Sequence, residues 1–270
     1  MNSTSRPQIL LTNDDSINSP GLWAAAEALE SLGFVNVVAP RSQHTSMGRA
    51  HPQTSDGRID AQIMVVNGKE WQVYAVGGSP AQSVLHGVLD VLKYKPDLVV
   101  SGINYGENVG SGMTISGTVG AALEASTMGV PTLAASLQTP TSAHYNLSKE
   151  VDFAIAAYFT HVFAQKILEH PMPFDVDVLN LNVPADATRE TPWVLTRQSR
   201  QRYFYPVDKS KQTPEEQGKI SYEARVDLTH PEPETDIWVI AHDHLVSVTP
   251  LSFDMTSRVN FEDLRKLLES

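Results

Sequence analysis

Apolar positions in the first half of the chain follow two patterns that alternate. Short, mostly apolar runs are typical of buried strands, and they lie at residues 8–12, 35–39, 97–101 and 132–136. Between them, apolar residues spaced three and four apart predict helices at residues 21–32, within 77–92 and at 116–128. Alternating strands and helices are typical of βαβ units, so the pattern predicts an α/β fold around a mostly parallel sheet.

Turn and capping residues set boundaries within this pattern. Asn67-Gly68 separates two runs of alternating apolar residues, which predicts a hairpin with a type I′ turn. Ser79 followed by Pro80 predicts a helix start, because serine caps the first turn and proline is favoured at the first helical position. Gly33 predicts the C-terminal cap of the helix at 21–32.

The second half of the chain is less regular. A helical pattern at 149–168 follows Ser148, a candidate N-cap, and residues 176–182 predict a strand. Residues 238–241 and 245–251 predict a pair of strands around a turn at His242-Asp243-His244. That turn also resembles a metal-binding motif, but a turn between two strands is the favoured interpretation.

Two further segments and one boundary complete the outline. Residues 209–219 are polar and predict a mobile loop, and residues 261–269 predict a short amphipathic helix. We divide the chain into a catalytic core at 1–137 and a remainder with a C-terminal extension at 138–270. A single domain over 1–270 is the alternative, because composition does not shift sharply at the boundary.

Composition narrows the possible functions. The 270 residues carry a formal net charge of −11, which argues against a nucleic-acid polymer or an anionic membrane as partner. There is no cysteine, so disulfides, thiolate metal sites and thiol nucleophiles are excluded. No apolar stretch approaches the roughly 20 residues that span a bilayer, and the N-terminus has no secretion signal, so we expect a cytoplasmic protein.

Oxygen-bearing side chains follow three of the predicted strands. They are Asn13, Asp14 and Asp15 after the first strand, Ser42 after the second, and Asn104 after the strand at 97–101. The carboxyl ends of parallel strands form one edge of a sheet, where ligands bind in folds of this kind. Carboxylate, hydroxyl and amide oxygens suit one Mg²⁺, Mn²⁺ or Ca²⁺ ion. The alternative is that Asp14-Asp15 only forms a turn and caps a helix.

A glycine-dense loop, "NYGENVGSGMTISGTVG", leads into the helix predicted at 116–128. Ser116-Gly117-Thr118 opens that helix, and the free N–H groups of a helix N-terminus bind phosphate. The alternative is a flexible loop before a tightly packed helix, since neither a P-loop nor a dinucleotide motif is present. A cation beside a phosphate site, with Asn13 as a further contact, predicts phosphoryl hydrolysis by a metal-bound water. Asp14 or Asp15 would act as the base.

Five segments in order carry a family resemblance. They are "ILLTNDDSINSPGL", "VNVVAPRSQHTSMG", "VGGSPAQSVLHGVL", "KPDLVVSGINYGENVG" and "SGTVGAALEASTMGVP". Together they resemble the SurE (survival protein E) family over most of residues 8–137, and "VLNLNVP" and "HDHLVSVTPLSFDMT" resemble it more weakly. The resemblance implies a three-layer, Rossmann-like α/β sandwich with a C-terminal extension that joins homodimers or homotetramers.

The same resemblance implies a metal-dependent phosphatase of nucleoside 5′- and 3′-monophosphates, with short polyphosphate as a further substrate of some members. It carries the family's metal-ligand roles to Asp14, Asp15, Ser42 and Asn104, and its phosphate contacts to Ser116-Gly117-Thr118. The chain departs from the family pattern at Ser16, where most members have glycine after the Asp pair. It also lacks the acidic residues that many members carry near residues 110–113.

Other side chains are candidates for substrate contact. His44 could assist the phosphate or protonate the leaving group, and Tyr105 could stack on a base; the alternatives are solvation for His44 and packing for Tyr105. A basic and aromatic cluster could reach a nucleotide or a neighbouring subunit, or form an exposed rim. Its members are Arg197, Arg200, Arg202, Tyr203, Phe204 and Tyr205.

Two other functions stay open from the sequence. A nucleotide-binding or scaffold protein that has lost turnover is consistent with Ser16 and with the missing acidic residues. A metal-dependent glycosyltransferase is a weaker alternative, because the chain lacks a spaced Asp-x-Asp motif.

Overall fold

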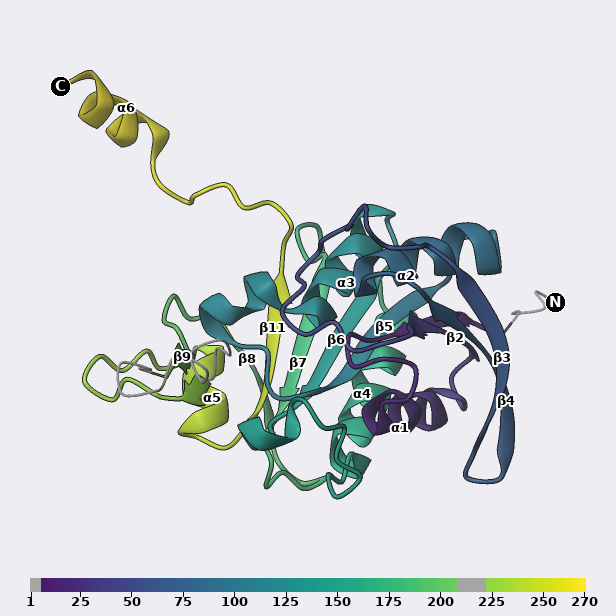
Figure 1. The fold of residues 1–270 in the computed structure, drawn as a ribbon. Coiled ribbons are helices and arrows are strands. Elements are labelled where there is room, and N and C mark those ends of the chain that lie inside the picture. Colours follow the sequence, from purple (N-terminus) through teal and green to yellow (C-terminus); the bar gives the residue numbers. More distant parts are fainter. Residues whose placement is uncertain (1–5, 208–221) are drawn as a thin grey trace, which may run out of the picture.

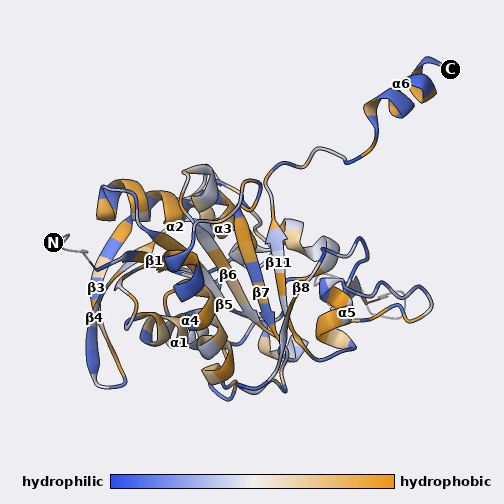
Figure 2. Ribbon diagram, turned by 180° about the vertical axis from the view of Figure 1, so that it is seen from behind, coloured by the Kyte–Doolittle hydropathy of each residue, from blue (hydrophilic) through white to orange (hydrophobic). Residues whose placement is uncertain are grey.

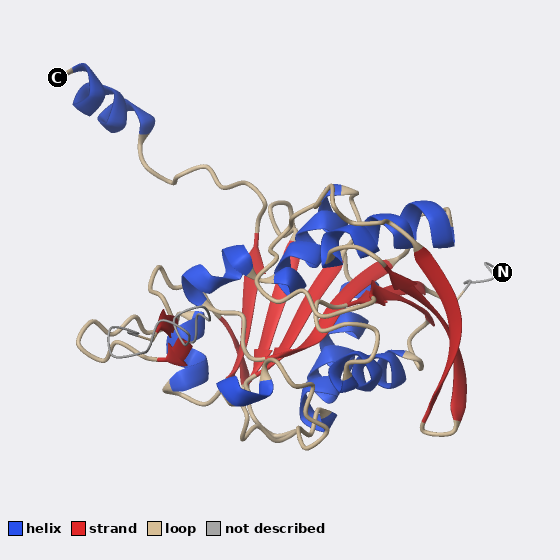
Figure 3. Ribbon diagram, viewed as in Figure 1, coloured by secondary structure: helices blue, strands red, loops and turns tan. Residues whose placement is uncertain are grey.

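The computed structural model describes residues 6–207 and 222–270. Within this part of the chain a nine-stranded sheet has the order β3-β4-β2-β1-β5-β6-β7-β11-β8 (Figure 1, Figure 3). Its strands are β1 Gln8–Thr12, β2 Phe34–Pro40, β3 Ile59–Val66, β4 Lys69–Val76, β5 Leu98–Tyr105, β6 Thr132–Leu137, β7 Val178–Val183, β8 Trp193–Leu195 and β11 Val246–Leu251.

The neighbouring strands from β4 to β7 are parallel, which confirms the predicted sheet. At one edge β3 pairs antiparallel with β4 through Asn67-Gly68, whose φ values of 48° and 80° are the positive angles that a type I′ turn requires. At the other side β11 pairs antiparallel with β7. The sheet runs without a break across residue 137, because β6 and β7 pair directly.

Helices cover both faces of the sheet. They are α1 Pro20–Leu29, α2 Pro80–His86 with a π-helical turn over Gly87–Leu92, α3 Gly117–Thr127 and α4 Ala154–Glu169. Figure 1 shows α1 and α4 on one face and α2 and α3 on the other. In β1, Ile9 and Leu11 pack on the first face and Leu10 on the second, as strand alternation requires. These layers confirm the three-layer α/β fold.

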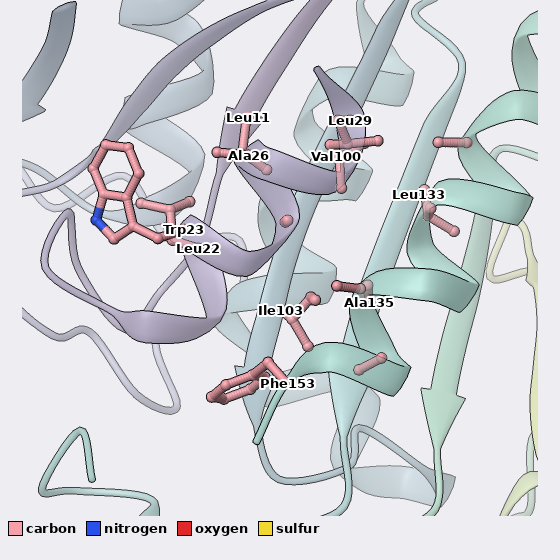
Figure 4. Packing of buried hydrophobic residues seen from close by; sticks show 14 of the residues in the cluster. Leu11, Leu22, Trp23, Ala26, Leu29, Val100, Ile103, Leu133, Ala135 and Phe153 are labelled. Atoms are coloured by element: carbon pink, nitrogen blue, oxygen red, sulfur yellow. The ribbon is translucent and has the colours of Figure 1, made fainter. Parts of the chain in front are cut away.

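Helix α1 lies unusually close to the sheet. Leu22 and Leu29 point from α1 toward the core, which also contains Val100 of β5 (Figure 4). A side-chain Cβ at Gly21 would lie 2.1 Å from the carbonyl oxygen of Ile103, so only glycine permits this approach. The close contact fixes the short segment between β1 and α1, which carries the Asp pair.

Two helix boundaries differ from the prediction. Helix α1 ends at Leu29, and Gly33 serves packing rather than capping, because a Cβ there would lie 2.5 Å from the carbonyl oxygen of Pro7. Helix α4 begins at Ala154 instead of residue 149, and Ser148 does not cap it. The N-cap of α4 is Phe153, whose side chain makes no capping bond, and the Asp152 carboxylate just before it accepts the Ala154 N–H at 2.8 Å.

The predicted strand at 238–241 is wrong. These residues belong to helix α5, Asp236–Ala241, and β11 pairs with β7 and β8 instead. Ile237 and Ile240 bury one side of α5 against Val109 and Tyr203. A short buried helix and a short buried strand have the same apolar content, so periodicity cannot separate them. His242 to His244 form a turn, as expected, but it joins helix α5 to β11 and not two strands.

The remaining elements lie around the sheet. They are the two-stranded sheet of β9 Phe204–Pro206 and β10 Tyr222–Ala224, the 3-10 helices Gly110–Ile115 and Thr141–Ala143, and α6 Phe261–Glu269. Helix α6 stands away from the body and mixes hydrophilic with hydrophobic residues (Figure 2). The loop predicted at 209–219 lies outside the described residues. Within the described ranges, no helix has the length and apolarity to cross a membrane.

Candidate active site

A cavity of about 490 Å³ lies where the parallel strands end. Asp14 and Asp15, which follow β1 directly, line it together with Asn104 from the end of β5. Both aspartates are buried, with exposed fractions of 4% and 2%. Because β1 and β5 are adjacent and parallel, their carboxyl ends bring these three predicted site residues together.

Asp14 is held by the start of α3. The Thr118 hydroxyl donates to its Oδ1 at 2.6 Å. Gly117 lies so close that a Cβ there would be 2.7 Å from the Cβ of Asp14. A glycine at this position therefore lets the helix N-terminus reach the carboxylate, whose negative charge the helix dipole favours.

Asp15 is held from two other segments. The Gln43 side-chain amide donates to its Oδ1 at 2.8 Å, and the Tyr105 N–H donates to its Oδ2 at 3.1 Å. The same Gln43 nitrogen donates to the carbonyl oxygen of His144 at 2.6 Å. Both oxygens of Asp15 therefore have fixed donors before any ligand binds.

The two buried carboxyl groups have strongly perturbed acidities. Burial raises the pKa of Asp14 to about 6, against the hydrogen bonds from Thr118. Burial, and then the charge of Asp14, raise the pKa of Asp15 to about 8. Among the described residues neither carboxylate has an ion pair with Lys, Arg or His. An adjacent pair of this kind is suited to a divalent cation.

Asn104 adds an amide oxygen to the carboxylates. Between Ser101 and Asn104 the pairing of β5 with β6 shifts register, and such irregularities re-aim side chains beside active sites. The Asn104 amide nitrogen donates to the carbonyl oxygens of Tyr105 and Gly106, at 3.1 and 2.7 Å. These bonds orient the amide and do not use its Oδ1, which is a suitable ligand for a hard cation.

Tyr105 contributes mainly through its backbone. Its ring packs edge-on against Phe153, with centroids 4.8 Å apart, and its hydroxyl donates to the carbonyl oxygen of Ser148 at 2.8 Å. The ring is buried, so the packing interpretation of this residue fits better than stacking on a base.

Ser42 and His44 lie on a second hollow, of about 340 Å³, which Arg41 and Gly77 also line. Gln43, which lies between them in the chain, turns toward Asp15 instead. The backbone of His44 still supports the site, because its N–H donates to the carbonyl oxygen of Asp14 at 2.7 Å. Partial burial lowers the pKa of the His44 imidazole.

The predicted phosphate contacts divide into two groups. Ser116 lines the cavity and caps α3, with its hydroxyl accepting the Val119 N–H at 3.1 Å. Gly117 and Thr118 are buried against Asp14. Asn13 is fully buried; its amide nitrogen donates to the carbonyl oxygen of Ser16 at 3.0 Å, and its Oδ1 has no hydrogen-bond partner among the described residues.

Aromatic residues form another side of the same cavity, and we call His144, Tyr145, Phe204 and Tyr222 the aromatic wall. Of the basic and aromatic cluster predicted from sequence, the cavity takes Arg202, Tyr203 and Phe204. Tyr205 instead lies under the Arg225 guanidinium, 5.5 Å from ring centroid to Cζ. His144, Tyr145 and Tyr222 had no sequence signal, because the turn at His144-Tyr145 and the short strand β10 carry no motif.

Two buried asparagines of β7 support the loop after β5. Asn182 accepts the Asn108 N–H at 2.7 Å, and Asn180 donates to the carbonyl oxygen of Asn108 at 2.9 Å. Asn108 itself lines the cavity. The alternation of polar residues in "VLNLNVP" was the available signal, since two polar side chains on one face of a buried strand need partners.

The sequence matches the family model described as Survival protein SurE over residues 9–205. The chain belongs to the SurE family. It is 41% identical to the 5'-nucleotidase SurE of Thermococcus gammatolerans over 97% of this chain and 96% of that protein. It is 40% identical to the 5'-nucleotidase SurE of Thermococcus kodakarensis, over 97% and 98%. The crystal structure of the SurE protein from Aquifex aeolicus superposes with a TM-score of 0.73 at 33% identity, over 98% of this chain and 100% of that one.

Ser16 stands where the SurE resemblance leads us to expect glycine, and its backbone has the glycine-like conformation. Its φ is 91°, a value that L-residues rarely adopt. The residue is buried, and its carbonyl oxygen accepts the Asn13 amide and the Ser19 N–H. The turn after the Asp pair therefore keeps its shape at a conformational cost on the order of 1 kcal/mol.

Proposed function

We propose that this chain is a divalent-metal-dependent phosphomonoesterase that hydrolyses nucleoside 5′-monophosphates to nucleoside and phosphate. The observation that carries the proposal is the buried Asp14-Asp15 pair at one side of a cavity large enough for a nucleotide. Close relatives bear the name 5'-nucleotidase over nearly their whole length, which supports the substrate class. Hydrolysis of 3′-monophosphates rests on the family resemblance alone.

One Mg²⁺, Mn²⁺ or Ca²⁺ ion would be held by Asp14, Asp15 and Asn104, with Ser42 as the fourth ligand carried over from the family. The fit rests on two adjacent buried carboxylates and an oriented amide oxygen, a hard donor set. The position of Ser42 on the second hollow leaves its role to the resemblance. The ion would supply Lewis acidity at the phosphate and lower the pKa of a water.

The protein's own groups account for orientation and proton transfer. Thr118 fixes Asp14 and Gln43 fixes Asp15, so both carboxylates are positioned before substrate arrives. One of the two accepts the proton that the attacking water loses. The first turn of α3, beginning at Ser116, directs backbone N–H groups and a partial positive charge to the phosphate oxygens. No covalent phosphoenzyme is needed, because a ligating carboxylate is poorly free to attack.

Phosphate release tests the proposal. The chain is assayed on a panel of nucleoside 5′- and 3′-monophosphates with Mg²⁺ or Mn²⁺, before and after EDTA. We expect release from 5′-monophosphates that chelation abolishes and added metal restores. Release that survives chelation would remove the metal from the proposal. Nucleotide binding with no release from any substrate would favour the rival reading as a binding or scaffold protein.

The C-terminal tail joins copies of this chain into a homodimer or homotetramer. Support comes from α6, which exposes Phe261, Leu264, Leu267 and Leu268 on a segment away from the body (Figure 1). Exposed apolar side chains gathered on one short helix are typical of an interaction surface. Light scattering on the full chain and on a chain ending at Leu251 tests this, and an unchanged mass after truncation would contradict it.

A further inference from the structure

The aromatic wall consists of rings that contact one another across three chain segments. Phe204 of β9 lies 5.7 Å from His144 and 6.4 Å from Tyr222 of β10, measured between ring centroids. The hydroxyls of Tyr145 and Tyr222 are hydrogen-bonded to each other, with ring centroids 6.5 Å apart. The rings therefore brace one another at angles and form a continuous apolar surface.

These rings are only partly covered by protein, although Phe204 also packs against the buried cluster that contains Val109 and Tyr203. Tyr145 is 54% exposed, and Phe204 and Tyr222 are half-buried, whereas the packed ring of Tyr105 is buried at 3% exposure. All three line the cavity. Burying an aromatic ring is strongly favourable, so rings left open on a cavity provide a surface for a flat, apolar ligand group.

The aromatic wall contacts the segment that follows Asn104, and it is also linked to Asp15. Gly106, two residues after Asn104, has a φ of 93°, and a Cβ there would lie 2.4 Å from the imidazole Nε2 of His144. Gln43 also joins Asp15 to the backbone of His144. The carboxylates and the rings thus have a fixed relation within one cavity of about 490 Å³.

We propose that Tyr145, Phe204 and Tyr222 form a stacking subsite that holds the base of the nucleotide substrate while its phosphate lies at Asp14 and Asp15. The inference rests on the proposed function, because it needs a substrate with a phosphate at one end and a flat ring at the other. Nucleobases stack on aromatic side chains with a substantial gain in affinity. Arg202, on the same lining, adds a guanidinium plane that also stacks on rings.

The test compares two substrates that share the sugar phosphate. Adenosine 5′-monophosphate carries a base and ribose 5-phosphate does not, so the ratio of their kcat/KM values isolates the contribution of the base. We expect wild type to favour the nucleotide by about tenfold or more, and Tyr222→Ala or Phe204→Ala to lower that ratio by about tenfold through KM. Tyr222→Phe and Phe204→Tyr keep a ring and should restore the ratio.

Phe174→Ala is the matched control, because Phe174 is fully exposed and does not line the cavity. Circular dichroism verifies that each variant is folded. His144 is left unchanged, since its backbone contacts Gln43. An unchanged ratio in folded Tyr222→Ala and Phe204→Ala would overturn the subsite, as would equal kcat/KM values of wild type for both substrates.

Failure of the proposed function is recognised separately. If wild type releases phosphate from neither substrate, the nucleotidase proposal fails, and equilibrium dialysis with adenosine then decides the subsite. Adenosine bound by wild type and lost from Tyr222→Ala would support a base-binding wall on a protein without turnover. Adenosine bound equally by both proteins, or by neither, would overturn the subsite.

Discussion

The aspartate side of the cavity and the aromatic wall are built in different ways. Asp14, Asp15 and Asn104 follow two adjacent parallel strands, are buried, and have their hydrogen bonds made within the protein. The aromatic wall comes from a turn at His144-Tyr145 and from the short strands β9 and β10, and most of its rings are partly exposed. Under the proposed function, the chemistry would reside on the sheet edge and the choice of substrate on the surrounding segments, a division common in enzymes.

Removing one carboxylate from the aspartate side of the cavity should cause the largest loss of activity. Asp15→Asn keeps the shape of the side chain but removes a charge that a divalent cation requires, so we expect phosphate release to fall on the order of a thousandfold. Circular dichroism should match wild type. A fully active variant would contradict the assignment of Asp15 as a ligand.

The second prediction concerns a buried carboxylate that joins the start of α5 to the loop after β5. Asp236 is fully buried and accepts the N–H groups of Ser199, Ile237 and Gly110 at 2.8 to 2.9 Å. Asp236→Asn replaces one acceptor with a donor, so we expect the free energy of unfolding in urea to fall by about 3 kcal/mol. Asp263→Asn on exposed α6 is the control, and equal losses in both would contradict the proposed role.

Thr118 tests whether the start of α3 positions Asp14. Thr118→Val removes the hydroxyl that donates to Asp14 at 2.6 Å and preserves the shape of the side chain. Supporting bonds of this kind are typically worth about 10- to 100-fold in metal affinity or activity. We expect weaker Mn²⁺ activation in Thr118→Val and near wild-type titration in Thr118→Ser. Identical titrations for Val and wild type would show that Asp14 does not depend on this bond.

The smallest expected effect is at Ser16. Ser16→Gly relieves a φ of 91° and should raise the free energy of unfolding by up to about 1 kcal/mol, less the entropy that glycine adds to the unfolded chain. Ser16→Ala keeps the unfavourable angle and should not gain stability. Urea unfolding of both variants provides the measurement, and a destabilised glycine variant would mean that the serine side chain stabilises this turn.

The same division decided what the sequence could predict. Asp14, Asp15 and Asn104 were predictable because strand ends in a parallel sheet converge, and β1 begins and ends where its apolar run does. Tyr145 and Tyr222 were not, because their position depends on how a turn meets the short strand β10 in the fold. The position of Ser42 on the second hollow could not be predicted either, because it accompanies the turn of Gln43 toward Asp15.

The secondary-structure errors have a related cause. Residues 238–241 have an apolar content that suits a strand or a helix, and packing of Ile237 and Ile240 against Tyr203 selects the helix. The start of α4 was missed because Ser148 is a plausible cap, whereas the helix begins only after Phe153, which has no capping side chain. The hydrophobic pattern predicted the type of an element correctly where the periodic segment was long.

The amide of Gln43 has a consequence for how such an enzyme can change. One nitrogen donates to Asp15 and to the backbone of His144, so a single side chain couples the Asp15 carboxylate to the loop that bears part of the aromatic wall. Substitutions that reshape this loop to accept a different base would also disturb Asp15. Phe204 packs against the His144 ring and Tyr222 bonds to the Tyr145 hydroxyl, so substitutions at these two rings should also be felt at Asp15.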